Sequence, residues 1–462
     1  MTIIEGVLIF FAIIFLYFII VVILNKIGFL EKHNISLAGP ALLLRTTKGL
    51  KFLKKLASKK RFWKAYGSSG IVVCFVAMII FVWFFLWNLT IVLGLTPEQR
   101  AQILPDARFY LILPGINPII PIDYIFYIIL AFAVAIIVHE FSHGIMTYAG
   151  KLKVKSMGIL YFILPVGAFV EPDEKQLKKT TIPKRMRVYA VGPLSNFVVF
   201  FICLILFSFV FMAAVHPGDG LTVYEVYEDS PAYDLGIVKG TIITDVNGTD
   251  LTTIPNVNEK FLEYGTILNN TKANDTITIS YIQNKVSYND IEIKLIDKYN
   301  YVVINASKGK GHTGIYSFVN ESGQLALLKN PFGDDPGYRL LMFISLPVLS
   351  YFEGYNPLAS PFTDSYNIEG PLGVIPDNVF WIIVNCIYWI AWLNLMVGIF
   401  NILPMIPLDG GYLFNDAIRA GVRRFKKNIS EEKSEMIVKN VSLVISLLIL
   451  FIILAPIFLK YI

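Results

Sequence analysis

Residues 124–148 read YIFYIILAFAVAIIVHEFSHGIMTY, an apolar run that is interrupted near its end by His139, Glu140 and His143. About 20 such residues let a helix cross a hydrocarbon core roughly 30 Å thick, so this run predicts a transmembrane helix. Comparable runs occur at residues 6–24, 71–95, 188–215, 380–400 and 441–459. The sequence therefore predicts an α-helical polytopic membrane protein with about six transmembrane helices.

The composition of the whole chain supports a membrane protein. Its 462 residues are 55% hydrophobic and 16% charged, with a mean hydropathy of +0.61, whereas soluble domains are typically about 25% charged. The three cysteines all fall within the apolar runs, which argues against disulfide bonds. Glu5 precedes the first run and no basic segment does, so we expect this run to be a retained helix and not a secretory signal.

Basic residues gather in three connecting segments, residues 45–64, 151–187 and 419–427. Loops rich in Lys and Arg stay on the cytoplasmic side of a membrane, so all three segments are expected there. If the six helices cross the membrane in alternating directions, both termini and residues 216–378 lie outside. The net charge of +6 is thus explained by topology and some attraction to anionic lipids, and nucleic acid is not an expected partner. The Ile, Lys and Asn content favours a prokaryotic plasma membrane.

These features divide the chain into five predicted segments. Residues 1–120 hold two transmembrane helices with a basic cytoplasmic loop, and residues 121–215 form a catalytic membrane core with the sequence HEFSH. Residues 216–320 are predicted to form an inserted α/β domain outside the membrane, followed by an outer or interfacial segment, residues 321–378. Residues 379–462 complete the membrane core with the sequence LDGG and a C-terminal helix.

The outer segment alternates polar and apolar residues, which is typical of a β-rich domain. We expect strands at residues 221–226, 241–246, 276–282 and 290–296, and a helix at residues 256–268. Residues 229–248, DSPAYDLGIVKGTIITDVNG, resemble a PDZ domain of the kind found in bacterial proteases, with Thr241 where those domains usually have Asp. The resemblance implies a groove beside a strand edge, where a peptide tail can add as an extra strand. The alternative is a compact spacer domain with no peptide in its groove.

Two further apolar segments are too short or too broken to be clear spans. Residues 157–170 contain Gly158, Pro165 and Gly167, which favour a membrane-dipping hairpin over a helix. Residues 340–352 lead into a Pro-rich stretch, and we expect an interfacial or re-entrant segment there.

The motif His139-Glu140-Phe141-Ser142-His143 carries the chemistry. Positions i and i+4 of a helix lie on one face, so His139 and His143 can both bind one metal ion. Glu140 lies about 100° around the helix from His139, where it can bond a water on that metal. Three ionisable side chains so close together in a membrane need compensation, which a divalent cation would supply. The alternative is a polar patch satisfied by neighbouring helices.

Catalytic zinc usually has three protein ligands, so a third residue must come from elsewhere in the chain. Asp409 is the candidate, because it lies in the stretch 401–411, NILPMIPLDGG, with almost no other ionisable side chain. Pro404 and Pro407 break the preceding helix, and such a break is tolerated at membrane depth only against protein or a water-filled cavity. From the residues alone, Asp409 could equally be the cap of a helix that begins near Gly411.

Two motifs on different spans, HEFSHG at residues 139–144 and the stretch 401–411, flank the PDZ-like insertion. Together they resemble the site-2 protease family of intramembrane metalloproteases. Ile406 stands where that family often has Pro, but the spacing between the Asn and the Asp of the later motif is kept. Residues 192–196, GPLSN, resemble a further element of the family beside the site. Asn196 is equally well explained as a residue that hydrogen-bonds between packed helices.

The resemblance implies a role for each matching residue. His139, His143 and Asp409 are expected to bind one Zn²⁺ per chain, and Glu140 is expected to be the general base. Asn401 matches the Asn that helps to hold the substrate or the developing oxyanion in that family.

The implied function is hydrolysis of peptide bonds in or near transmembrane segments of membrane-protein substrates, as in regulated intramembrane proteolysis. The expected partners are a substrate with a transmembrane helix and the lipid bilayer, with the active site toward the cytoplasmic side and the PDZ-like domain outside. One alternative is a membrane metalloprotease that clips prenylated C-termini, which uses Glu as third ligand and is disfavoured by the Asp409 motif. The other is a non-catalytic, zinc-stabilised scaffold or chaperone that binds protein tails, which has no need of Glu140.

Overall fold

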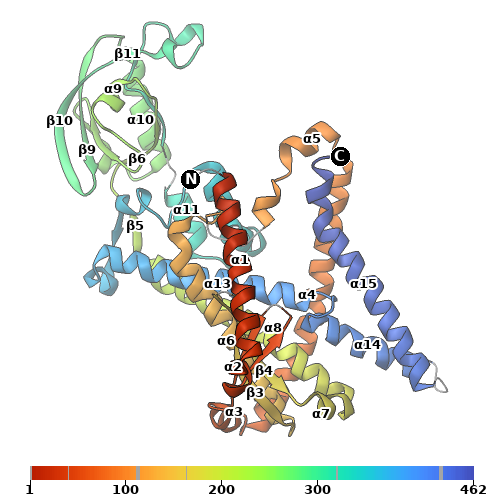
Figure 1. The fold of residues 1–462 in the computed structure, drawn as a ribbon. Coiled ribbons are helices and arrows are strands. Elements are labelled where there is room, and N and C mark those ends of the chain that lie inside the picture. Colours follow the sequence, from red (N-terminus) through yellow and green to blue (C-terminus); the bar gives the residue numbers. More distant parts are fainter. Residues whose placement is uncertain (1–2, 40, 111–114, 163, 319–320, 426–429) are drawn as a thin grey trace. The chain divides into compact units, whose positions relative to one another are not determined.

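The computed structural model of the chain describes residues 3–39, 41–110, 115–162, 164–318, 321–425 and 430–462. The chain folds into two compact units, each described by itself below (Figure 1). The first unit comprises Met1–Leu111, Ile125–Phe201 and Ile390–Ile462, and the second comprises Ile112–Tyr124 and Ile202–Trp389. Both motifs that are expected to bind metal lie in the first unit, and the predicted outer domain lies in the second.

Among the residues that the structure describes, five helical segments are long and apolar enough to cross a membrane. They are Lys60–Gly94, Ile122–Ala149, Ile182–Ala214, Asp377–Ile402 and Glu431–Leu459. Their α-helices are α4 (Lys60–Gly94), α6 (Ile125–Ala149), α8 (Ile182–Ile205), α13 (Asp377–Ile402) and α15 (Glu431–Leu459). These match the last five predicted spans. The first predicted span lies in α1, Ile3–Lys26, where Ile14–Lys26 forms a shorter apolar helix, so the count of six stays a prediction.

The first unit also contains a four-stranded antiparallel sheet in the order β1-β2-β3-β4. The strands are β1 (Ile35–Ala38), β2 (Ala41–Thr46), β3 (Val154–Phe162) and β4 (Leu164–Pro172). Strands β3 and β4 form a β-hairpin over residues 157–170, and its place in the membrane stays a prediction. Strands β1 and β2, which the sequence-based expectation does not include, extend this hairpin on the β3 side.

Short helices connect these elements of the first unit. They are α2 (Phe29–Lys32), α3 (Leu50–Leu56), α5 (Pro97–Ile103), α7 (Glu174–Lys179) and α14 (Asp409–Phe425). Gly144 of α6 lets α3 and β4 pack closely, since a Cβ added there would lie 2.8 Å from Leu53 Cδ1 and 3.0 Å from Val170 Cγ1. Leu53 and Val170 are buried in this contact, which brings the sheet against the helix that carries HEFSH.

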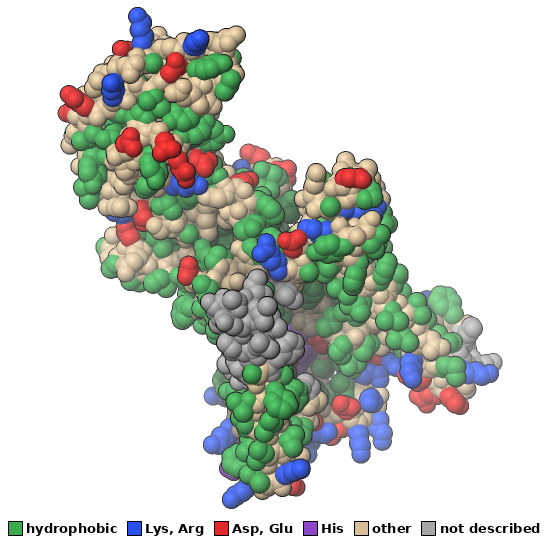
Figure 2. All heavy atoms as spheres, turned by 45° about the horizontal axis from the view of Figure 1, so that its top comes forward, with side chains coloured by type: hydrophobic (Ala, Val, Ile, Leu, Met, Phe, Trp, Pro, Cys, Tyr) green, Lys and Arg blue, Asp and Glu red, His purple; other side chains and the backbone are tan. Residues whose placement is uncertain are grey.

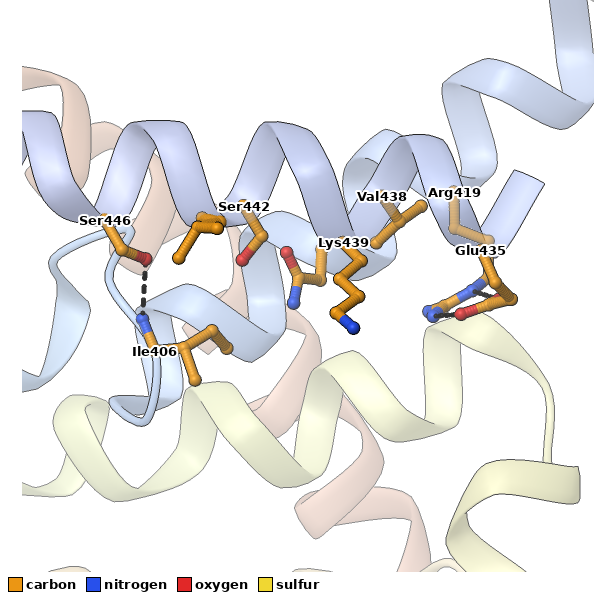
Figure 3. Close-up of a pocket in the computed structure, with 9 residues that line it drawn as sticks. Ile406, Arg419, Glu435, Val438, Lys439, Ser442 and Ser446 are labelled. Atoms are coloured by element: carbon orange, nitrogen blue, oxygen red, sulfur yellow. Dashed lines mark hydrogen bonds and ion pairs between the residues drawn. The ribbon is translucent and has the colours of Figure 1, made fainter. Parts of the chain in front are cut away.

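Ion pairs fix helix α14, which begins at Asp409. The guanidinium of Arg185 on α8 donates two hydrogen bonds to the carboxylate of Asp416 on α14, at 2.9 Å and 2.7 Å. Asp416 is 2% exposed, so this pair is buried. Arg419, one turn further along α14, binds Glu435 of α15 at 2.6 Å (Figure 3). A bidentate Arg–carboxylate pair restricts the orientation of its two partners relative to each other. The buried pair therefore helps to fix how α14 is oriented against α8, and with it the direction of Asp409 at the start of α14.

The segment that leads into α14 is held by α15. The backbone N–H of Ile406 donates to Ser446 Oγ at 3.0 Å, beside a pocket between α14 and α15 (Figure 3). Leu403 is fully buried against Ile449 and Ile452 of the same helix. The Pro-broken stretch is therefore packed against protein, as required of irregular backbone at membrane depth.

Apolar side chains remain exposed along the candidate spans. Ile79 of α4, Ile129 of α6 and Phe451 of α15 are 68%, 63% and 63% exposed. Figure 2 shows hydrophobic side chains over much of the visible surface, with many Lys and Arg side chains toward the lower end of the view. Exposed apolar surface of this extent is rare on soluble monomers and is what a lipid environment accommodates.

The second unit contains the outer domain, whose sheet has the order β10-β9-β7-β6-β13, with β8 paired to β7. The strands are β6 (Leu221–Val226), β7 (Ile242–Val246), β8 (Thr249–Asp250), β9 (Thr276–Gln283), β10 (Val286–Lys294) and β13 (Ile315–Phe318). Its two helices are α9 (Pro231–Asp234) and α10 (Val257–Asn269). The four predicted strands and the predicted helix are all found, with ends shifted by a few residues.

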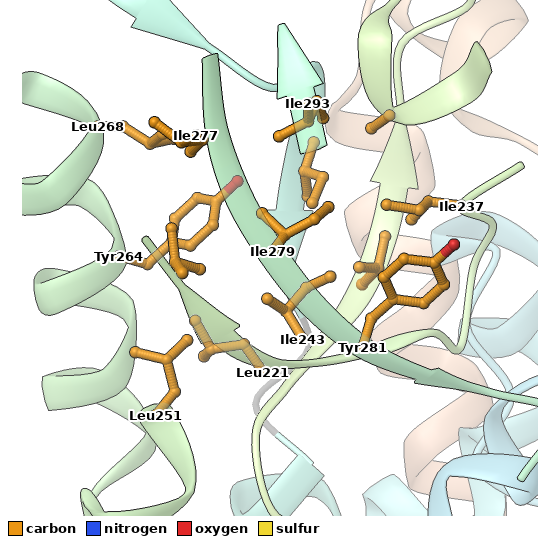
Figure 4. Close-up of a cluster of buried hydrophobic side chains, with 14 of the residues drawn as sticks. Leu221, Ile237, Ile243, Leu251, Tyr264, Leu268, Ile277, Ile279, Tyr281 and Ile293 are labelled. Atoms are coloured by element: carbon orange, nitrogen blue, oxygen red, sulfur yellow. The ribbon is translucent and has the colours of Figure 1, made fainter. Parts of the chain in front are cut away.

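The core of the outer domain lies between this sheet and α10. Leu221 of β6, Ile243 of β7 and Ile279 of β9 are buried side by side, and Tyr264 and Leu268 of α10 cover them (Figure 4). The core residues of β9, Ile277, Ile279 and Tyr281, are spaced two apart, as residues on one face of a strand are. This domain therefore has a hydrophobic core of its own.

The rest of the second unit includes helix α12 (Pro336–Glu353) and a two-stranded sheet of β5 (Val215–Pro217) and β14 (Tyr366–Ile368). The segment expected to be broken, residues 340–352, is part of α12, which continues through Pro347. Phe343 is buried and its ring lies 5.0 Å from that of Tyr388, so packing stabilises a helix that its sequence disfavours. Its place at a membrane interface stays a prediction.

His312 is a buried histidine of the outer domain. It lies in β12 (Gly311–His312), is buried, and accepts a hydrogen bond at Nδ1 from the backbone N–H of Gly314, at 2.7 Å. Burial, together with the nearby charge of Lys298, lowers the pKa of His312 to about 4. The imidazole is therefore neutral in the folded domain at pH values where an unfolded chain, with a His pKa near 6.5, is already protonated.

We expect the stability of this domain to fall as the pH drops from about 6.5 toward 4, because the unfolded state then binds the additional proton. Between pH 7 and pH 5 the loss is about 2 kcal/mol. His312→Asn keeps an acceptor for Gly314 but removes the titration, so its stability is expected to change less over this interval. Thermal unfolding of this domain within the full-length protein can be monitored by the rate of proteolysis within residues 221–318, for the wild type and for His312→Asn. Equal pH dependence of the two proteins would contradict the role given to His312.

Candidate metal centre

The three predicted metal ligands lie together in the first unit. His139 and His143 are one turn apart on α6, with ring centroids 4.8 Å apart. Nε2 of His139 lies 2.9 Å from Asp409 Oδ2, and Nε2 of His143 lies 3.0 Å from the same oxygen. Both imidazoles are buried. The fold thus joins one residue pair on α6 to a carboxylate that follows 266 residues later.

Asp409 reaches the histidines because the start of α14 approaches α13 closely. A Cβ on Gly410 would clash with the backbone of Ile402, and a Cβ on Gly411 would lie 2.6 Å from the carbonyl group of Met405. Only glycine permits this approach. Helix α14 begins at Asp409 itself, and the carboxylate points at the imidazoles, so the alternative of a cap for a helix starting near Gly411 is disfavoured.

Both histidines are oriented through their other ring nitrogen. Nδ1 of His139 lies 3.0 Å from Asn196 Oδ1, and Nδ1 of His143 lies 2.6 Å from the backbone carbonyl oxygen of Val188. Because each of these partners is an acceptor oxygen, each Nδ1 is the protonated nitrogen. The Nε2 lone pairs are then free to bind a metal, which is the usual arrangement of histidine ligands.

This donor set fits zinc. Two imidazole nitrogens and one carboxylate oxygen are a common catalytic combination, and they leave a fourth position for water. With bonds of about 2.0 Å, ligand atoms of a tetrahedral zinc are about 3.3 Å apart, close to the separations between each Nε2 and Asp409 Oδ2. His139, His143 and Asp409 are also the one group of at least three possible ligands found together among the residues described.

The charge of Asp409 suits a metal ligand. The carboxyl group of an aspartate has an ordinary pKa near 3.9, and a divalent cation beside it favours the charged form further. The side chain is therefore an ionised carboxylate at neutral pH.

Glu140 lies next to the ligands on α6, and β4 holds it. The backbone N–H of Val170 donates to Glu140 Oε2 at 2.8 Å. One carboxylate oxygen is thus engaged with the sheet, which orients the side chain that the motif assigns as a base. The catalytic role itself rests on the motif and is taken up below.

The asparagines around the site differ in their contacts. Asn196 of α8 contacts His139 and also donates from Nδ2 to the Ala135 carbonyl and to Asn394 Oδ1, each at 3.3 Å. It therefore both orients a ligand and links helices, so the two explanations considered for it hold together. Asn401 donates to the Val397 carbonyl of its own helix at 3.0 Å, and its proposed catalytic role stays a prediction.

Two contributors to the site were not expected from the sequence, and a third, Gly192, lies in the element GPLSN that the resemblance places beside the site. Val170 and Val188 act through backbone atoms, for which side-chain identity carries no signal. Gly192 of α8 faces both ligands: a Cβ there would lie 2.5 Å from His143 Nε2 and 2.7 Å from His139 Nε2. The Gly in GPLSN could have indicated such a close approach, because a helical Gly before Pro is otherwise unfavourable.

Comparisons with known proteins agree on one family. The sequence profile of peptidase family M50 matches residues 127–449, which include all three proposed ligands. An uncharacterized protein of Methanocaldococcus jannaschii is 26% identical over 405 residues, covering 86% of this chain and 80% of that protein.

Two further relatives carry functional names. Zinc metalloprotease RasP of Shouchella clausii is 26% identical over 282 residues, 58% of each chain. Regulator of sigma-W protease RasP of Bacillus subtilis is 22% identical over 285 residues, again 58% of each chain.

Proposed function

The chain belongs to peptidase family M50, the site-2 protease family, and on this premise we propose that it is an intramembrane zinc metalloprotease. Its substrates are membrane proteins, and the bonds it cleaves lie in or near their transmembrane segments. The name of the Bacillus subtilis relative, a regulator of sigma-W, supports a place in regulated intramembrane proteolysis.

The observation that carries this proposal is the meeting of His139, His143 and Asp409, with Glu140 beside them. A purely structural zinc site is closed by four protein ligands and needs no base. Here three ligand side chains converge, and a carboxylate adjacent to them is held by a backbone N–H. This combination favours a hydrolase over the scaffold or chaperone.

The chemistry follows from these residues. Zinc held by His139, His143 and Asp409 would supply Lewis-acid chemistry that makes water a stronger acid near neutral pH. Glu140 accepts the proton from the attacking water through its carboxylate and then delivers it to the leaving amine. The hydrogen bond from Val170 to Oε2 leaves Oε1 available for this transfer. Asn401 is assigned to hold the substrate carbonyl, where its Nδ2 group would donate to the developing oxyanion.

Substrate access imposes a further requirement. A peptide bond inside a helix is shielded by the backbone hydrogen bonds of that helix, so the substrate span has to unwind near the metal. Substrates with Gly, Pro or polar residues in their spans are therefore favoured. The basic connecting segments support a site toward the cytoplasmic side of the membrane and an outer domain on the opposite side, and the proposed membrane is a prokaryotic plasma membrane.

Removal and return of zinc test this function. The purified protein in detergent is expected to cleave a single-span model substrate, to lose this activity after chelation, and to regain it on addition of about one equivalent of Zn²⁺ per chain. Mass spectrometry of the products locates the cleaved bond. Retention of the substrate without cleavage by the zinc-loaded protein would instead support the scaffold or chaperone.

The outer domain is assigned to substrate selection as a PDZ-type module. Strand β13 is the last strand of its sheet, and α10 lies beside it, with the Phe318 ring 4.9 Å from Tyr264 and 6.0 Å from Phe261. Tyr316 of β13 and Phe261 of α10 are 57% and 52% exposed. A peptide tail could add to β13 as an extra strand and place apolar side chains against these rings.

Phe261→Asp is expected to weaken selection without damaging the catalytic site. A charge beside the proposed groove disfavours an apolar tail, so cleavage of a substrate with an outer tail should fall several-fold, as KM rises. A substrate without the outer tail should be cleaved at the same rate by both proteins. Equal selection by Phe261→Asp and the wild type would support the spacer alternative.

A further inference from the structure

Val170 connects the sheet to helix α6 at two points, one of which is the base Glu140. Its backbone N–H donates to Glu140, and its side chain packs against Gly144, one turn further along α6. Val170 is 6% exposed, so both contacts are shielded from water. The position of β4 along α6 therefore determines whether Glu140 keeps its hydrogen bond.

The next residue, Glu171, ties β4 to the other strands. Its Oε2 accepts a hydrogen bond from Ser156 Oγ of β3 at 2.8 Å and pairs with Arg45 Nη1 of β2 at 3.1 Å. Lys155 Nζ lies 3.8 Å from the other carboxylate oxygen. Because successive side chains of a strand point to opposite faces, Glu171 is directed away from the face on which Val170 meets α6.

Arg45 comes from a part of the chain outside the family match. Strand β2 lies before residue 127, where the match to peptidase family M50 begins, and it pairs with β3 in register, Arg45 opposite Gly158. The guanidinium of Arg45 also lies 5.9 Å from the centroid of the Phe169 ring on β4. Strands β1 and β2 are called the N-terminal hairpin below. Through Arg45, this hairpin contacts β4 on both sides of Val170, at Phe169 and at Glu171.

We propose that Glu171 is a positioning residue for Glu140 and that Arg45 of the N-terminal hairpin acts with it. The two residues hold β4 at the position along the axis of α6 at which the Val170 N–H can donate to Glu140. Neither residue touches the reacting atoms. This inference rests on the proposed protease function. Partly exposed ion pairs such as this contribute little to overall stability, whereas a small displacement of a catalytic group has a large effect on rate.

Substitutions of the pair test this inference in the full-length, zinc-loaded protein with a single-span model substrate. Glu171→Ala and Arg45→Met are each expected to lower kcat about tenfold, with KM and zinc content unchanged. The double variant should be no worse than either single one, because both act through one contact. Glu171→Gln keeps acceptors for Ser156 and Arg45 and should retain most of the activity. Glu174→Ala, an exposed carboxylate of α7, is the matched control.

A second readout does not depend on cleavage. Hydrogen exchange of the β4 amides in Glu171→Ala should be faster than in the wild type, because the Val170 N–H loses its partner. Unchanged exchange and unchanged kcat would overturn the inference, as would a rise in KM alone, which would assign the sheet to substrate binding. A wild type that holds zinc but cleaves nothing would instead refute the proposed function, whatever the exchange of β4.

Discussion

Glu140→Gln is expected to keep one zinc per chain and to lose about a thousandfold in kcat. Gln has nearly the shape of Glu and can still accept the hydrogen bond from the Val170 N–H, so the packing of β4 against α6 should persist. The amide cannot take a proton from water, so the general base alone is removed. Metal analysis and single-turnover cleavage of a model substrate measure the two effects separately.

The matched control for this variant is Glu174→Gln, which neutralises an exposed carboxylate that pairs with Lys178 on α7. It should cleave at the wild-type rate. A Glu140→Gln protein that cleaves normally would remove Glu140 from the mechanism and leave the base unassigned. Loss of zinc together with activity would show that Glu140 supports the metal site, and the division of roles within HEFSH would then be wrong.

The helical part of the site was predictable because its geometry is local. His139 and His143 are separated by one helical turn, so the sequence alone places both imidazoles on one face. Asp409 is different, because the residues left its role open between a metal ligand and a helix cap. We chose the ligand role for Asp409 because of the family resemblance. The fold supports this role, because the close approach of Gly410 and Gly411 to α13 brings Asp409 to the histidines.

The parts that escaped prediction depend on tertiary contacts. Strands β1 and β2 lie in a segment whose charges suggested a connecting loop, although Gly39 and Pro40 between two apolar stretches are a turn signal. Strand β2 pairs with β3, more than 100 residues later, and β1 pairs with β2. Val188 and Val170 serve the site through a carbonyl and an N–H, which any residue would supply. Pattern reasoning therefore finds ligands more readily than the groups that orient them.

Gly192→Ala is expected to weaken zinc binding strongly while leaving the chain folded. The new methyl carbon would lie 2.5 Å from His143 Nε2 and 2.7 Å from His139 Nε2, in the space where the lone pairs meet. The imidazoles cannot easily turn aside, because the Nδ1 atoms are held by the Val188 carbonyl and by Asn196. We expect zinc affinity to fall by about a hundredfold or more, and cleavage to fall with it.

The helical preference of Ala offsets part of the cost of this contact. Gly192 lies inside α8, where Ala is favoured over Gly by about 0.5–1 kcal/mol, whereas overpacking a buried site costs about 1–3 kcal/mol, so the variant without zinc should be at most modestly less stable than the wild type without zinc. Gly421→Ala in α14 is the control, since a Cβ there meets nothing within 4 Å. It should gain the helical preference and keep its zinc. If Gly192→Ala also kept zinc and activity, the metal could not lie between His139, His143 and Asp409. The assignment of these three residues as metal ligands would then be wrong.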